Sequence, residues 1–181
     1  MKRTTHHIAT ARPPRTLMEV YRMLPEGTRA EIINGVLFMS PAPTLSHQDT
    51  IFLLSGQLYN WIRKNKMGKA FSSPIDVYLN SKNAFQPDIV FVSNKNFSIL
   101  KDDGIYGAPD FVIEVLSPGT RQFDLNKKKS AYEKAGVAEY WVVDPLTKEC
   151  FGFAARAGSF EALKKQKNKF KSPLLGLTFK L

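Results

Sequence analysis

The sequence predicts an α/β protein in which a central mixed β-sheet is flanked by helices. Two short segments, 111–116 and 140–143, are rich in the branched and aromatic residues that strands favour. Residues 124–135 lie between them, have helical periodicity and end at Gly136, which fits the position after a helix. The three pieces have the spacing of a strand–helix–strand unit. A second, longer helix is expected over residues 46–66.

Length and composition are those of an ordinary globular domain. The chain has 181 residues, of which 43% are hydrophobic and 23% are charged, which argues against a disordered chain, a collagen or a coiled coil. We expect a single domain over residues 16–181 and a mobile basic arm over residues 1–15. No apolar run approaches the ~20 residues of a membrane-spanning helix. The basic start is not followed by an apolar segment, so no secretory signal is expected.

The N-terminal half is predicted to form a short helix, a hairpin and the long helix. Residues 16–19 have the pattern of a capping box, which opens a helix to about residue 24. The dipeptide Asn34-Gly35 between two apolar runs predicts a tight β-hairpin over 30–39. Ser46 is expected to cap the long helix, whose apolar residues recur at helical spacing.

The second half is predicted to supply the rest of the sheet. Strands are expected near residue 70, over 75–79 and over 88–92, and residues 94–108 are expected to be irregular. Two or three weaker strands and a tail should complete the chain.

The net charge indicates a polyanionic partner. Lys and Arg number 26 against 16 for Asp and Glu, which gives a formal charge of +10. Such a balance is typical of nucleic-acid-binding proteins, although a well-solvated surface would also produce it. Five lysines within residues 164–171 fit either a basic edge strand or a surface that follows phosphates, and the sequence leaves both open.

Glu114 is a carboxylate in an unusual place. The strand around it is apolar on both faces, which predicts a central strand buried on both sides. A carboxylate there is costly unless it is paired, hydrogen-bonded or bound to a metal. The simpler alternative is an ion pair with a buried arginine or lysine.

Three further residues could join Glu114 in one site. Asp88 follows Pro87 and opens an apolar strand, where turn chemistry is the alternative. Glu31 lies in the predicted hairpin, where an outward-facing position is the alternative. Lys128 falls within the apolar stripe of its helix at about 100° per residue, although a lysine that reaches water is the alternative there.

Together these residue types predict metal-assisted hydrolysis of a phosphodiester. Two or three carboxylates can hold Mg²⁺ or Mn²⁺, and a nearby lysine can orient a water molecule or offset charge on phosphorus. The sequence contains no phosphate-binding loop, no nucleophile elbow and no zinc-binding helix motif, so it does not support the chemistries that depend on them. Cys150 is the single cysteine, so intrachain disulfides and multi-cysteine metal sites are excluded. We expect Cys150 to be a small core residue and not a nucleophile. A chain with a single cysteine fits a reducing cytoplasm.

The chain resembles the Uma-type restriction endonuclease family, a branch of the PD-(D/E)xK nuclease superfamily, from about Leu17 to the C-terminus. Each matching motif is weak alone, and their order makes the signal specific. The motifs are AEIING at 30–35, SHQ at 46–48, SPIDV at 73–77, QPDIVFV at 86–92, APDFVIEVLSP at 108–118 and GVAEYWVVDP at 136–145.

The resemblance implies a restriction-endonuclease-like core and a set of site residues. Asp88 and Glu114 would bind Mg²⁺ or Mn²⁺, and Glu31 would join them. The superfamily lysine normally stands two residues after the second acid, where this chain has Leu116. In this family a lysine of the following helix is implied to replace it, and four residues before Tyr132 that lysine is Lys128.

The resemblance implies two further candidates. His47 matches a family histidine in the first turn of the long helix, where it would contact a phosphate or a metal-bound water. A partly exposed histidine at a helix start is the alternative. Gln86 is a candidate for the rim of the site.

Three hypotheses follow. The first is a divalent-metal-dependent endonuclease that hydrolyses DNA. The second is a nucleic-acid-binding protein that has the nuclease fold without catalysis. The third is an interaction protein, with a homodimer formed through the aromatic surface around Tyr140 and Trp141. Cutting both strands of a duplex often uses two active sites, so a homodimer also fits the first hypothesis. No membrane partner is expected.

Overall fold

The computed structural model describes residues 12–117, 119 and 121–181. Residues 1–11 of the arm expected over residues 1–15 therefore lie outside the described residues. The first helices and strands are α1 (Leu17–Arg22), β1 (Ala30–Ile33), β2 (Val36–Met39), α2 (Leu45–Asn65), β3 (Gly68–Ser72), β4 (Val77–Asn80), β5 (Asn83–Phe85), β6 (Ile89–Ser93), the 3₁₀ helix η1 (Asn94–Ile99), β7 (Leu100–Lys101) and β8 (Gly104–Tyr106). There follow β9 (Phe111–Val115), the π-helix η2 (Phe123–Lys128), α3 (Lys129–Ala135), β10 (Glu139–Val143), β11 (Glu149–Arg156), β12 (Ser159–Ala162), β13 (Gln166–Lys167), β14 (Lys169–Lys171) and β15 (Thr178–Lys180).

A mixed β-sheet forms the centre of the molecule. Its strand order is β12-β11-β10-β9-β6-β3, with β13 beside β11. β9 and β10 run parallel, with η2 and α3 between them in the chain, whereas β6 pairs antiparallel with β9. The predicted fold class and the strand–helix–strand unit are confirmed.

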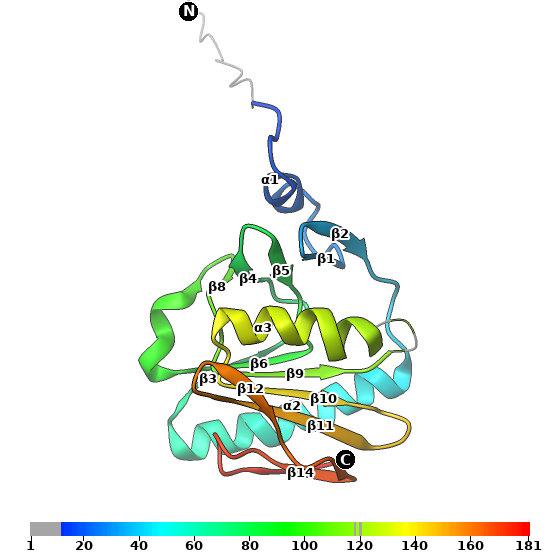
Figure 1. Ribbon diagram of the computed structural model, residues 1–181, viewed down its shortest axis with the longest axis vertical. Helices are drawn as coiled ribbons and strands as arrows, with labels where there is room; N and C mark the ends of the chain where they lie inside the picture. The colour runs from blue at the N-terminus through cyan, green and yellow to red at the C-terminus, as the bar shows by residue number, and fades with distance from the viewer. Residues whose placement is uncertain (1–11, 118, 120) are drawn as a thin grey trace, which may run out of the picture.

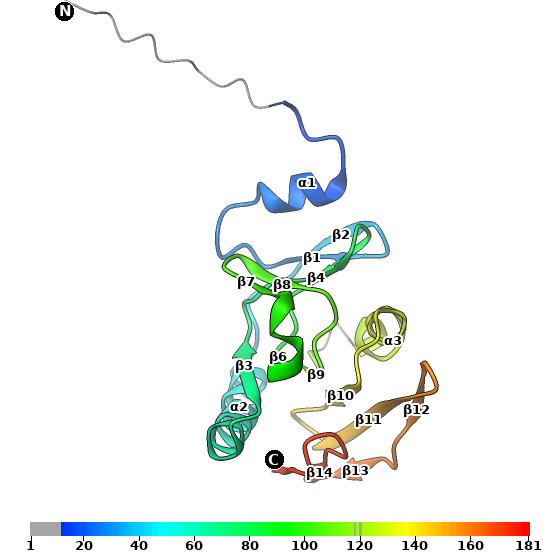
Figure 2. The ribbon, with the colours of Figure 1, turned by 90° about the vertical axis from the view of Figure 1, so that its left-hand side faces the viewer.

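The two helices cover opposite faces of this sheet, as Figures 1 and 2 show. α2 packs Leu54 and Leu58 against Phe111 and Ile113 of β9. On the other face, Tyr132 of α3 belongs to the core that contains the alternate strand residues. Because both faces are covered, β9 is buried along its whole length.

A second sheet lies beside the first and carries the predicted hairpin. Its order is β2-β1-β5-β4-β8-β7, with α1 packed outside it (Figure 1). The hairpin turns at Asn34 and Gly35, both of which have positive φ, 51° and 77°. This is the backbone of the tight turn that the Asn-Gly pair predicts. The hairpin and the capping box of Thr16 and Glu19 are confirmed.

Several local predictions are corrected by the structure. Thr44, not Ser46, caps α2, because its hydroxyl accepts the backbone N–H of His47. Residues 94–108 are not irregular, since they contain η1, β7 and β8. Five strands, not two or three, follow β10. Tyr140 and Trp141 form no surface, because both are fully buried in β10. None of the described helices is long and apolar enough to cross a membrane.

Candidate active site

A pocket of about 420 Å³ opens where the hairpin meets the central sheet. The inner face of the hairpin contributes Glu31 and Phe38 to its wall, and the loop before α2 closes one side. β9 and η2 supply the opposite wall. The acidic side chains that line it are those of Glu31, Asp88, Glu114 and Asp124.

Glu114 enters the pocket from β9. Its exposed fraction is 3%, as the apolar faces of the strand predicted. One carboxylate oxygen, Oε1, lies 3.1 Å from Lys128 Nζ and accepts a hydrogen bond of 2.9 Å from the Tyr132 hydroxyl. The buried carboxylate is therefore paired with a buried lysine.

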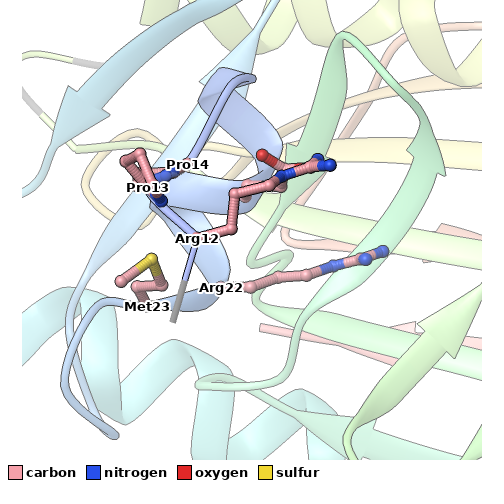
Figure 3. A pocket seen from close by; sticks show the side chains of 6 residues that line it. Arg12, Pro13, Pro14, Arg22 and Met23 are labelled. Carbon is pink, nitrogen blue, oxygen red and sulfur yellow. The ribbon is translucent and has the colours of Figure 1, made fainter. Parts of the chain in front are cut away.

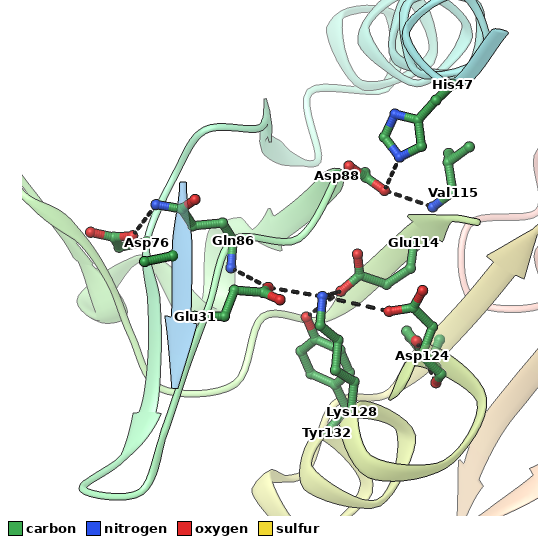
Figure 4. A network of polar contacts seen from close by, with 12 residues as sticks. Glu31, His47, Asp76, Gln86, Asp88, Glu114, Val115, Asp124, Lys128 and Tyr132 are labelled. Atoms are coloured by element: carbon green, nitrogen blue, oxygen red, sulfur yellow. Dashed lines mark hydrogen bonds and ion pairs between the residues drawn. The ribbon is translucent and has the colours of Figure 1, made fainter. Parts of the chain in front are cut away.

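Lys128 lies at the centre of the acidic cluster, as Figure 4 shows. Its Nζ is 2.8 Å from Glu31 Oε1, 3.1 Å from Glu114 Oε1 and 3.5 Å from Asp124 Oδ1. The whole residue is 5% exposed, so the amine points inward and does not reach water. Its neighbour Lys127 is exposed. The helical stripe thus correctly predicted that Lys128, and not Lys127, points inward. The turn is a π-helix and not the α-helix that the stripe assumed.

Asp88 stands beside Glu114 on the neighbouring strand. The antiparallel register pairs Ile89 with Ile113, which places Asp88 and Glu114 next to each other across the two strands. Asp88 Oδ2 accepts a hydrogen bond of 2.7 Å from the Val115 N–H.

His47 reaches Asp88 from the first turn of α2. Its Nε2 lies 3.4 Å from Asp88 Oδ2, and the residue is only 5% exposed. The histidine is therefore buried against the candidate site. The alternative of a partly exposed histidine at a helix start is wrong. Its other ring nitrogen, Nδ1, is buried and has no hydrogen-bond partner among the described residues.

Glu31 and Gln86 connect the hairpin to the site. Glu31 Oε1 accepts a hydrogen bond of 2.8 Å from the Gln86 backbone N–H, in addition to its contact with Lys128. The Gln86 side chain donates to Thr28 O at 3.1 Å and to Asp76 Oδ1 at 3.0 Å. Gln86 thus holds the hairpin in place. Glu31 points inward, so the alternative of an outward-facing position for Glu31 is wrong.

The charges of the cluster shift the pKa values of Glu114 and Lys128. Burial raises the pKa of the Glu114 carboxyl, Lys128 lowers it, and the neighbouring carboxylates raise it further, so that it stands well above its ordinary value. Burial lowers the pKa of Lys128, but Glu114, Glu31 and Asp124 outweigh this and raise it well above its ordinary value. Lys128 is therefore held charged, and three carboxylates, those of Glu31, Glu114 and Asp124, share its ammonium group.

Two residues of the cluster escaped the sequence analysis. Asp124 is 2% exposed and stands four residues before Lys128. That spacing was a usable signal, because residues at i and i+4 of a helix are neighbours. Tyr132 is fully buried and donates to Glu114. In the sequence, Tyr132 is recognisable only as an apolar residue of the buried helix stripe, and its hydroxyl gives no sign of a partner.

The oxygen donors of the pocket fit a divalent cation that takes only part of its shell from the protein. Among the described residues, no group of three or more His, Cys, Asp or Glu side chains is arranged to hold a metal ion by itself. Glu31 and Glu114 both contact Lys128, whereas Asp88 and Glu114 stand side by side across neighbouring strands, so these two are the pair that can share one ion. Two hard oxygen donors fit Mg²⁺, which uses one or two carboxylates and completes its shell with water or substrate oxygens. The excess of negative charge also favours a cation.

A second hollow of about 260 Å³ lies beside α1 (Figure 3). It is lined by Arg12, Pro13, Pro14, Arg22 and Met23 together with Glu19. Glu19 is the one carboxylate among the described residues that line it, and that carboxylate accepts backbone N–H groups at the helix start. This hollow therefore lacks the paired acids of the larger pocket.

Comparisons with known proteins identify a family and a similar fold. The Uma2 family, described as "putative restriction endonuclease", matches residues 17–180. The chain is also similar to a crystal structure from Anabaena variabilis ATCC 29413, described as a "putative nuclease belonging to DUF820". The two share 20% sequence identity with a TM-score of 0.72, over 90% of this chain and 92% of the other. At that identity the likeness establishes the fold. No curated protein gives a significant match.

Proposed function

The chain belongs to the Uma2 family, and from that premise we propose that it is a divalent-metal-dependent endonuclease that hydrolyses DNA phosphodiester bonds. The observation that carries the proposal is the position of Glu114. Its buried carboxylate stands beside Asp88 on the next strand and is paired with an inward-pointing lysine. Acids and a lysine in this arrangement suit metal-assisted hydrolysis better than core packing.

Asp88 and Glu114 are the residues that would hold Mg²⁺ or Mn²⁺. Their contacts within the described chain use Asp88 Oδ2 and Glu114 Oε1, which leaves the second oxygen of each carboxylate for a ligand. When bound, the cation would neutralise charge on a phosphate and lower the pKa of a water ligand. His47 and the Val115 N–H hold Asp88 in place.

Lys128 would act on the water or the phosphate. Its ammonium group is kept charged by Glu31, Glu114 and Asp124. Glu31 and Glu114 lie within hydrogen-bond distance of Nζ, which leaves at most one of its three donors for a ligand. Such a group can orient a water molecule and offset negative charge as it develops on phosphate oxygens. Glu31 and Asp124 are positioning residues in this scheme, because they hold the amine.

DNA is proposed as the substrate because of the charge of the chain. The formal charge of +10 would attract a polyanion, and the release of counterions would make the binding sensitive to salt. Cleavage of both strands would need two such sites. We therefore also propose a homodimer, which sedimentation of the full chain can test.

The proposal is tested by incubating supercoiled plasmid with the protein and Mg²⁺, Mn²⁺ or EDTA at low salt. Nicking is expected with either metal ion and not with EDTA. Asp88→Ala should abolish it, whereas Asp49→Ala, an exposed residue of α2, should not. Nicking that persists in Asp88→Ala or in EDTA would contradict the proposal.

A second candidate function is nucleic-acid binding without catalysis. It is favoured by one observation, namely that Leu116 occupies the position of the superfamily lysine. This reading predicts DNA binding that survives EDTA and Asp88→Ala, with no nicking under any condition. The plasmid experiment therefore separates the two functions.

A further inference from the structure

Arg29 belongs to the same pocket and has no role in the cluster described above. It stands one residue before β1, where its carbonyl accepts the Ser40 N–H at 3.0 Å and extends the hairpin by one pair. Alternate residues of a strand share a face, so Arg29 and Glu31 point to the same side. Both residues line the pocket.

The Arg29 guanidinium has no partner within the described part of the chain. No hydrogen bond, ion pair or ring contact involves its side chain there, and its Nε is buried without an acceptor. A guanidinium has five donors and stays charged. A buried donor that lacks an acceptor is costly, so the position favours a ligand that brings acceptors.

The acids of the pocket are not that ligand. Lys128 pairs with Glu31, Glu114 and Asp124, and Asp88 is held by His47 and Val115. None of these carboxylates lies within ion-pair distance of Arg29, although they line the same pocket. Because each of these carboxylates contacts a partner other than Arg29, the Arg29 guanidinium can bind an anion that enters the pocket from outside.

A phosphate group is the anion that this arginine fits best. The planar fork of a guanidinium binds two phosphate oxygens at once, which a lysine cannot match. Ser40, opposite Arg29 in the hairpin, also lines the pocket. The pocket thus has a cationic group, Arg29, on the hairpin and the Asp88 and Glu114 carboxylates on the central sheet, and a phosphodiester strand can lie between them.

We propose that Arg29 is a substrate-binding residue that holds one phosphodiester group of the strand entering the pocket. The inference rests on the proposed function, because it names how the site takes up its substrate. It assigns binding to Arg29 and leaves hydrolysis to Asp88, Glu114 and Lys128. A purely structural arginine would instead contribute contacts within the protein.

The first test measures binding of a labelled DNA duplex in EDTA over a series of salt concentrations. A hydrogen-bonded ion pair of this kind corresponds to a loss of about 10-fold to 100-fold in affinity, which is expected for Arg29→Gln. The slope of log affinity against log salt should fall by about 1. Arg29→Lys should keep the slope and lose part of the affinity. Arg63→Gln on the exposed face of α2 is the matched control.

The second test follows the ¹⁵Nε–¹Hε NMR signal of Arg29, assigned with Arg29→Lys, during titration with a dinucleoside monophosphate. The Arg29 signal should shift and that of Arg63 should not. The thermal midpoint of Arg29→Gln should equal that of the wild type, because no native contact is lost. A silent Arg29 signal, or Arg29→Gln that binds DNA like the wild type, overturns the inference.

The two tests separate this inference from the proposed function. An Arg29 signal that responds, in a protein that never nicks plasmid with Mn²⁺, supports the phosphate site and contradicts the endonuclease. Metal-dependent nicking with an unchanged Arg29→Gln supports the endonuclease and overturns the role of Arg29. A protein that binds no DNA at low salt contradicts both.

Discussion

Replacing Lys128 with methionine removes the cation of the acidic cluster while it keeps most of the side-chain volume. At separations of about 3 Å, and with an effective dielectric constant of about 20, each ammonium–carboxylate contact is worth about 5 kcal/mol before desolvation. Lys128 makes three such contacts, at 2.8, 3.1 and 3.5 Å. Desolvation of several kcal/mol per ion offsets most of this attraction.

The net cost is dominated by the carboxylates that remain. Removing one partner of a buried ion pair destabilises a protein by about 3–5 kcal/mol, because the other charge stays buried. We expect Lys128→Met to lose this much free energy of unfolding near neutral pH. The raised pKa of Glu114 favours its proton in the folded state, so the loss should shrink as the pH falls.

Urea denaturation of matched variants measures this cost. Lys127→Met, next to Lys128 and exposed, should change stability by less than about 0.5 kcal/mol. Adding Glu114→Gln to Lys128→Met should recover part of the loss, because it removes one unpaired charge. If Lys128→Met costs no more than Lys127→Met at every pH, the amine reaches water and the buried cluster is refuted.

Three further outcomes are expected. Tyr132→Phe removes the donor to Glu114 and should cost about 2 kcal/mol in urea denaturation; a neutral change would show that the hydroxyl does not stabilise the carboxylate. Burial raises the pKa of the Glu139 carboxyl although hydrogen bonds from Trp141 and Leu174 lower it, so its stabilising contribution is complete below the unfolded-state pKa and is lost as the pH rises. Glu139→Gln should therefore gain stability relative to the wild type from acidic to neutral pH, and a constant difference would contradict this. Burial also raises the pKa of the Cys150 thiol to about 12, so an alkylating reagent at neutral pH should modify Cys150 only after the protein unfolds. Fast labelling of Cys150 in the native protein would refute this prediction.

The parts of the site that the sequence predicted are those in which periodicity decides which way a side chain points. Alternation along β9 placed Glu114 in the interior, and the stripe of the following helix selected Lys128 over Lys127. Asp88 could be placed because a proline fixed the start of its strand. These predictions depend on short-range geometry, which a sequence contains.

The missing parts depend on contacts between distant segments. β5, β7 and β8 are two or three residues long, too short for a period to be read, so the second sheet was not predicted. The burial of His47 arises only when α2 packs against β6 and β9. Tyr140 and Trp141 were assigned to a surface because aromatic strands suit both interfaces and cores, and only the covered sheet decides between them.

Binding of Mn²⁺ tests the central claim most directly, because it does not depend on the choice of nucleic acid. Calorimetric titration should find one ion per chain in the wild type and in the exposed variant Asp49→Asn. Asp88→Asn and Glu114→Gln should each lose this binding, since Mn²⁺ would lose one of its two carboxylates. Unchanged Mn²⁺ binding in both of these variants would contradict the claim that Asp88 and Glu114 form the metal site.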